Sequence, residues 1–159
     1  MKKRLVPALV CVLFLTGCST VPQEIAVSGV GAEYTITVGV PGDAVEVPTE
    51  AGKLYRHEGG EYEISTTAFA SDHVFAAVEY LTGSQNPTEL TEHTRFGLPE
   101  YRVQWLNEKE NTRCHADFVL DNGICYAVVF QVQTDRADAY VPLVTEVFST
   151  FGLHVDEGV

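Results

Sequence analysis

Basic residues are scarce in this chain of 159 residues. Lys and Arg together number 10 against 22 Asp and Glu, which leaves a formal net charge of −12 at pH 7. A field of this sign repels nucleic acid and anionic lipid headgroups, and no cluster of cations offsets it. We therefore expect no nucleic-acid partner, and we interpret the acidity as typical of a self-repelling surface rather than of a patch for a basic partner.

Catalytic and metal-binding motifs are also missing. The chain has no Gly-x-Ser-x-Gly elbow, no glycine loop for phosphate and no dinucleotide-binding glycine motif. Its histidines do not follow the His-x-x-x-His spacing of zinc sites, and its late aspartates do not follow the calcium-loop pattern. These residues are His57, His73, His93, His115 and His154, and Asp117, Asp121, Asp135 and Asp138. The sequence therefore predicts no enzyme, no cofactor and no metal site.

No apolar run reaches the roughly 20 residues that a helix needs to cross a bilayer. The run at residues 5–15 is shorter, contains Pro7, and follows three cations, Lys2, Lys3 and Arg4. A cationic start, a short apolar run and a site of small residues are typical of an export signal. An uncleaved signal anchor and a buried hydrophobic helix are the alternatives.

The segment Leu-Thr-Gly-Cys at residues 15–18 directly follows this apolar run. It resembles the lipobox of bacterial lipoproteins. The resemblance implies that the chain is exported, that Cys18 receives a diacylglyceryl group, and that residues 1–17 are removed. Two or three acyl chains hold a protein firmly on a membrane. We therefore expect a lipid-anchored protein on a bacterial membrane, facing outside the cytoplasm.

The remaining chain suits one domain preceded by a tether. Residues 18–32 carry the lipidated Cys18 and then a mixture of small, polar and helix-breaking residues without periodicity, which indicates a flexible tether that lifts the domain off the membrane. Residues 33–155 have the length of a single domain with a modest core. No internal repeat is visible.

Strand and helix patterns alternate along the first half of this domain. Residues 34–38 predict a strand that ends at a Pro-Gly-Asp turn, and residues 53–57 and 62–67 predict a hairpin around Gly59 and Gly60. Residues 74–81 repeat apolar side chains at three- and four-residue spacing, which predicts an amphipathic helix. We expect Ser71 or Asp72 to cap its start and Gly83 to end it.

The second half predicts a meander followed by a helix. Four extended segments, residues 91–96, 101–106, 114–120 and 124–132, are joined by a Gly-Leu-Pro segment, a polar loop and an Asn122–Gly123 turn. The last of these segments is nearly all apolar, so it should lie at the centre of the sheet. Residues 140–151 carry an apolar stripe, with Pro142 in the first turn and Gly152 at the end, and should form a helix that packs on the sheet.

This order of elements resembles the PsbP-like fold, which is shared by an extrinsic photosystem subunit and many small bacterial lipoproteins. The resemblance covers residues 33–153 and rests on the pattern of strands and helices. It implies an α+β domain, an antiparallel sheet of about six to seven strands with two packed helices in a PsbP-like sandwich. It also implies a binding or assembly accessory rather than a catalyst.

Cys114 and Cys125 are the thiols left in the exported domain, and such a pair suggests a disulfide. In a two-residue Asn122–Gly123 hairpin, however, Leu120 faces Cys125, so Cys114 lies on the order of 20 Å away along the strands. A bridge needs Cα atoms within about 7 Å. Either residues 111–115 fold back, or the turn is not the simple one, or both thiols stay reduced.

Trp105 is the single tryptophan of the chain. Strand alternation places it on one face with Tyr101 and Val103. This face either packs in the core or, if it is exposed, forms a ligand or partner surface at Tyr101 and Trp105.

The sequence thus predicts a membrane-anchored surface lipoprotein that acts as a non-catalytic module. It would bind the membrane through lipid on Cys18, and an envelope protein or a small ligand through its domain. The alternatives are an enzyme or metal-dependent hydrolase whose site is assembled by the fold, and a structural spacer.

Overall fold

The structure is a computed structural model that describes residues 21–25, 34–49 and 52–155. The expected signal peptide at residues 1–17 and the lipidation site Cys18 lie outside the described residues. No helix in the described part of the chain is both long and apolar enough to cross a membrane.

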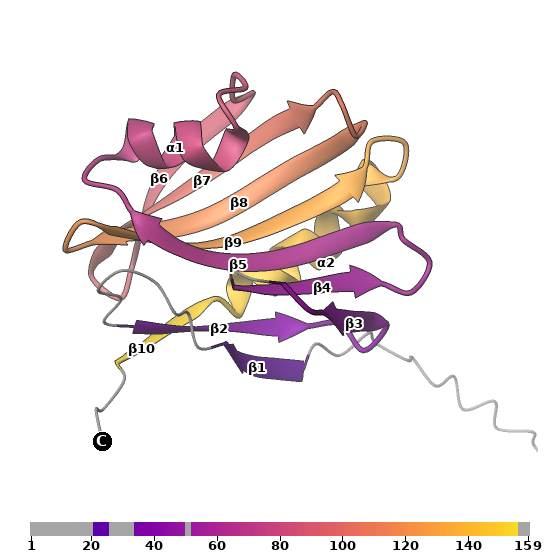
Figure 1. Cartoon of the computed structure of the whole chain (residues 1–159), viewed down its shortest axis with the longest axis horizontal. Helices are drawn as coiled ribbons and strands as arrows, with labels where there is room; N and C mark the ends of the chain where they lie inside the picture. Colours follow the sequence, from indigo (N-terminus) through magenta and orange to yellow (C-terminus); the bar gives the residue numbers. More distant parts are fainter. Residues whose placement is uncertain (1–20, 26–33, 50–51, 156–159) are drawn as a thin grey trace, which may run out of the picture.

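A seven-stranded antiparallel sheet forms the centre of the molecule (Figure 1), in the order β3-β4-β5-β9-β8-β7-β6. Its strands are β3 (Ala44–Val47), β4 (Lys53–His57), β5 (Tyr62–Ala70), β6 (Glu89–Arg95), β7 (Leu98–Asn107), β8 (Thr112–Asp121) and β9 (Ile124–Gln133). The predicted α+β architecture, with its sheet of six to seven strands, is confirmed.

The meander and the early hairpin follow the sequence prediction closely. Asn122 and Gly123 both have positive φ, 48° and 77°, as a tight turn between twisted strands requires. Leu120 accordingly pairs with Cys125. One connection was predicted wrongly, because the chain turns at Phe96 and Gly97, so that Leu98 and the next residue already belong to β7.

A second, three-stranded sheet was not predicted. It consists of β1 (Val21–Ile25), β2 (Tyr34–Val40) and β10 (Gly152–Val155), with β2 paired to both neighbours. Strand β1 occupies five residues of the segment expected to be a flexible tether, and its register runs antiparallel along β2. These short edge strands carry little periodicity of their own and form because β2 offers two edges for pairing.

The two helices are α1 (Val74–Thr82) and α2 (Ala137–Ser149). Gly83 ends α1 in the left-handed conformation, as predicted, but the cap at its start is the His73 ring, which accepts a hydrogen bond from the Ala76 N–H, and not Ser71 or Asp72. Helix α2 starts earlier than expected, so Pro142 lies inside it, and Gly152 begins β10 instead of ending the helix.

The helices cover opposite faces of the large sheet (Figure 1). Side chains of β9 alternate between two cores: Tyr126, Val128 and Phe130 pack with α2 and β2, whereas Cys125 and Ala127 pack with α1. This strand is therefore covered on both faces, which explains its nearly continuous apolar sequence.

Candidate functional site

Strands β7 and β8 present different chemistry to their two faces. Val103 and Trp105 of β7 pack with Cys114 and Ala116 of β8 in the core beneath α1. Because neighbouring residues of a strand point to opposite faces, the residues between them face the side of α2. Those residues are polar or charged: Glu100, Arg102 and Gln104 on β7, and Arg113, His115 and Asp117 on β8.

A cleft of about 220 Å³ separates part of this polar face from α2, and we call it the α2 cleft. Its sheet side consists of Arg102, Gln104, Arg113 and His115, and its helix side of Val141, Val144, Thr145 and Phe148. The helix residues follow the i, i+3, i+4, i+7 spacing of a single face. The α2 cleft therefore combines two cations with an apolar wall.

Both arginines of the α2 cleft are half-exposed, with 42% and 39% of the side chain accessible for Arg102 and Arg113. Arg102 donates its Nε–H to Asp117 Oδ2 at 3.1 Å, and Arg113 donates from Nη1 to Asp138 Oδ1 at 2.9 Å. Asp138 is almost fully exposed, and exposed pairs of this kind contribute little to stability, about 0–1 kcal/mol. Each guanidinium has five N–H donors, so both keep donors for a ligand.

His115 lies between the two arginines and is only 9% exposed. Burial lowers its pKa to about 4, and the nearby charge of Arg113 acts in the same direction. The ring is therefore neutral at pH 7, with one nitrogen as a donor and the other as an acceptor. Within the part of the chain that the structure describes, its ring makes no hydrogen bond and lines the α2 cleft.

A buried charge network closes one end of this face. Arg95 on β6 pairs with Glu100, lies 3.5 Å from Asp117 Oδ2, and donates to the backbone carbonyls of Phe148 and Phe151 at 3.0 and 2.8 Å. These carbonyls lie at and just beyond the end of α2, where the helix leaves its own carbonyls without partners. Arg95 therefore fixes the end of α2 on the sheet.

The two carboxyl groups of this network differ in pKa. Burial, together with a hydrogen bond and the charge of Glu100, raises the pKa of Asp117 to about 7 in spite of Arg102 and Arg95. Burial also acts to raise the pKa of Glu100, but hydrogen bonds with Arg95 and Asp117 outweigh it, so that pKa is lowered. Asp117 Oδ1 accepts no hydrogen bond within the described ranges and is fully buried.

The cysteines are not brought together. Cys114 lies opposite Gln131 and Cys125 opposite Leu120, so six positions of the ladder separate them, and both are free and buried. The simple Asn122–Gly123 turn predicts this register. Burial raises the pKa of both thiols, which keeps them protonated and unreactive at neutral pH.

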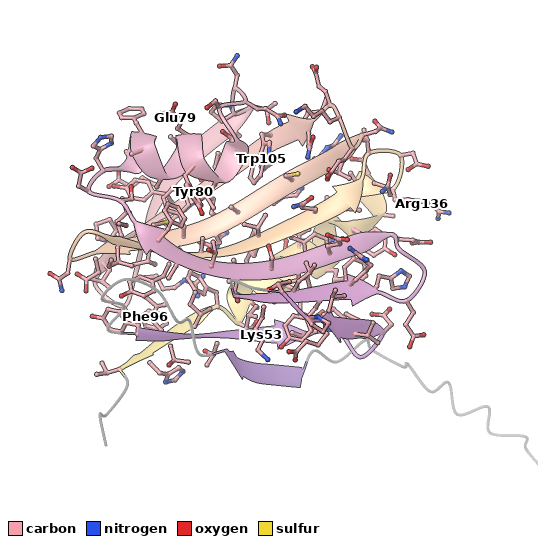
Figure 2. All side chains as sticks on the ribbon, viewed as in Figure 1. Lys53, Glu79, Tyr80, Phe96, Trp105 and Arg136 are labelled. Carbon is pink, nitrogen blue, oxygen red and sulfur yellow. The ribbon has the colours of Figure 1, made fainter. Side chains whose placement is uncertain are left out.

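Trp105 is buried, so it belongs to the core and not to an exposed ligand surface. Its ring lies between α1 and the large sheet (Figure 2), with Ala77 and Val78 in the same cluster. Tyr101 is partly buried and stacks on Phe118 at 5.5 Å. The exposed aromatic side chains on this side are Phe75 and Tyr80 of α1.

The scattered histidines and aspartates also stay apart. Among the described residues, no group of three His, Cys, Asp or Glu side chains could share a metal ion. Asp121 instead accepts a hydrogen bond from Tyr34, and Asp138 pairs with Arg113.

Sequence reasoning did not identify the α2 cleft, although a signal was present. In β7 and β8, polar residues occupy every second position, 100, 102 and 104 and then 113, 115 and 117, while apolar residues fill most positions between them. On a face that also receives an amphipathic helix, such a polar stripe indicates a buried network or a site. Only the register shows that the two stripes are adjacent.

Comparison with known proteins establishes the fold of this domain. No protein-family model and no curated protein matches the sequence. Among solved structures, the chain is similar to cyanobacterial PsbP (CyanoP) from Synechocystis sp. PCC 6803, with a TM-score of 0.59 and 12% identity over 87% of this chain and 95% of that chain. LpqN, involved in cell envelope biogenesis of Mycobacterium tuberculosis, gives a TM-score of 0.49 and 13% identity over 83% of this chain and 91% of that chain. The similarity to CyanoP shows that the domain has the PsbP-like fold.

Proposed function

We propose that this protein is a lipid-anchored, non-catalytic binding module of the bacterial envelope, and that its binding site is the α2 cleft. The anchor is supported by the lipobox-like segment that ends at Cys18, behind a short apolar run and three cations. The PsbP-like fold serves as the scaffold, and function on a scaffold must be argued from a site.

One observation carries the binding role. In a strongly acidic chain, the α2 cleft combines two half-exposed arginines, a neutral histidine and an apolar helix wall. Sites for small ligands typically have this composition, an apolar lining with a few polar groups that fix orientation. The buried Arg95 network holds both walls in place, so the cleft is largely preformed.

The anchor lies close to the folded domain. Val21, where β1 begins, comes three positions after Cys18, and three chain steps span at most about 11 Å. Lipid on Cys18 therefore holds the domain directly at the membrane surface, with the small sheet as the part nearest to the attachment point.

The anchor is tested by Cys18→Ser in the full chain, with Cys11→Ala as the control within the apolar run. We expect Cys18→Ser to lose incorporation of labelled palmitate and to accumulate unprocessed, because its hydroxyl cannot replace the thiol that carries the diacylglyceryl group. Cys11→Ala should keep labelling and processing. Continued labelling of the Cys18→Ser chain would overturn the anchor.

The binding site is tested by a photo-crosslinking amino acid at Val141, with Val45 on β3 as the matched control. The two valines are 49% and 48% exposed, so both positions tolerate a larger side chain. We expect irradiation of intact cells to give a defined adduct from position 141 and none from position 45. Equal adducts from both positions would mean that the α2 cleft is not a specific site.

A further inference from the structure

The charges of the α2 cleft are arranged around a neutral centre. Gln104 and His115 are direct partners in the β7–β8 ladder, whereas Arg102 lies opposite Asp117 and Arg113 opposite Leu106. The two arginines are thus four ladder positions apart, about 13 Å along the strands. Their long side chains can converge from both ends on a group that sits above His115.

The donors in this arrangement are not used up by the protein. In the contacts made among the described residues, Arg102 donates only its Nε–H, Arg113 only Nη1, and the His115 ring makes no hydrogen bond. The polar atoms of the His115 ring are not sealed from the cleft, so they can hydrogen-bond to water or to a ligand there. A carboxylate placed there would accept charge-assisted hydrogen bonds from both guanidiniums.

The charge balance favours one negative charge on the ligand. Arg95 and Arg102 face Glu100 and the buried Asp117, and Asp117 carries a full charge only when it is deprotonated. The counterion of Arg113 is the exposed, weakly bound Asp138. Glu89, which accepts a hydrogen bond from Gln104 at 2.8 Å, adds a negative charge at the edge of this face, so the arginines carry no large excess of positive charge. Arg113 is the guanidinium with the most exposed counterion, and a single carboxylate is enough to complete its hydrogen bonds.

The size and the opposite wall of the cleft restrict the rest of the ligand. Val141, Val144 and Phe148 form an apolar surface across from the arginines. The volume of about 220 Å³ lies below the roughly 300–1,000 Å³ typical of sites for drug-sized molecules. A compact apolar body fits this space, and a long acyl chain does not.

We propose that the α2 cleft binds a small monocarboxylate with a compact apolar body, the carboxylate held by Arg102 and Arg113 beside His115 and the apolar body held against α2. This inference rests on the binding role proposed above and names its ligand chemistry. The site would thereby recognise small hydrophobic acids outside the cytoplasm.

The test is calorimetric titration of the purified full-length protein with phenylacetate. Phenylacetamide serves as the neutral isostere, acetate as the carboxylate without an apolar body, and inorganic phosphate as a different anion. We expect saturable binding of phenylacetate, and at least tenfold weaker binding of each of the other three. Equal binding of phenylacetamide or phosphate would overturn the carboxylate assignment.

Two variants locate the binding site. Arg113→Gln removes one guanidinium, and Val141→Asp places a negative charge in the apolar wall; both positions are substantially exposed, so folding should be preserved. We expect each to weaken phenylacetate binding at least tenfold. The control Arg56→Gln, an exposed arginine paired with Glu63 away from the cleft, should bind like the wild type.

Failures of the two proposals can be told apart. Absence of phenylacetate binding, together with a specific photo-adduct from position 141, would overturn the monocarboxylate inference and leave the binding module standing. Phenylacetate binding that Arg113→Gln and Val141→Asp both leave unchanged would overturn the site. Continued palmitate labelling of the Cys18→Ser chain would overturn the anchor alone.

Discussion

Each face of strands β7 and β8 is covered by a helix, and the two faces differ in the residues that they present to it. Toward α1, alternate residues are apolar, and Trp105 with its neighbours forms a closed core. Toward α2, the intervening residues are charged or polar, and the helix leaves a cleft above them. The same two strands thus stabilise the fold on one face and present chemistry on the other, because strand alternation lets each face evolve its own residues.

The polar face tolerates burial because its charged groups are paired. Asp117 and Glu100 are buried, and burial of an unpaired charge is costly. Arg95 and Arg102 supply the opposite charges, and Asp117 keeps its proton up to about pH 7. The α1 face needs no such compensation, since its buried side chains are apolar.

The largest loss of stability should follow from a substitution on the apolar face. Trp105→Ala empties the core between α1 and the sheet, and truncations of buried aromatic side chains cost about 3–5 kcal/mol. We expect a loss of this size in the free energy of unfolding, measured by urea denaturation. Phe75→Ala, at an exposed position of α1, is the control and should change it by less than about 1 kcal/mol. Similar losses for both variants would contradict the assignment of Trp105 to the core.

A smaller loss is expected on the polar face from Arg95→Met. Methionine retains much of the side-chain volume but leaves Glu100 and two carbonyls at the end of α2 without their donor. Breaking a buried ion pair costs about 3–5 kcal/mol, and we expect the lower end of that range because Arg102 still faces Asp117. Urea denaturation measures the loss, with Arg136→Met, an exposed arginine, as the control. An unchanged free energy of unfolding would mean that Arg95 does not hold α2.

The smallest expected effect is the dependence of stability on pH, which two buried groups of the polar face should influence in opposite directions. The raised pKa of Asp117, from 3.8 to about 7, gives stability that is lost as pH rises from 3.8 through about 7. The lowered pKa of His115, from 6.5 to about 4, gives stability that is lost as pH falls from 6.5 through about 4. Between pH 5 and 6.5 the two slopes oppose each other.

Single variants should therefore separate the two slopes. Asp117→Asn leaves His115, so the free energy of unfolding should rise with pH from 5 to 6.5. His115→Gln leaves Asp117, so the free energy of unfolding should fall over the same pH range. Each slope approaches about 1.4 kcal/mol per pH unit, the value for one proton. Urea denaturation at three pH values measures it, and slopes of the same sign in both variants would contradict this account.

Much of the fold could be predicted because its signals are local. The Asn122–Gly123 turn, the Gly83 helix end and the apolar β9 sequence each depend on residues close together in the chain. The register between Leu120 and Cys125 followed from the turn alone. The small sheet could not be predicted in this way, because β1 and β10 exist through pairing with β2, a partner distant in sequence for β10.

The acidity, the absence of catalytic motifs, the lipobox-like segment and the order of most strands and helices can be read from the sequence, since these features depend on composition and short-range patterns. The folded chain was needed to show that Trp105 lies in the core, that Arg102, Arg113 and His115 share one cleft, and that β1 begins three residues after Cys18. The physical reason is that a ladder register and the seat of α2 join residues that are far apart in the chain, and no local pattern records which faces they will share.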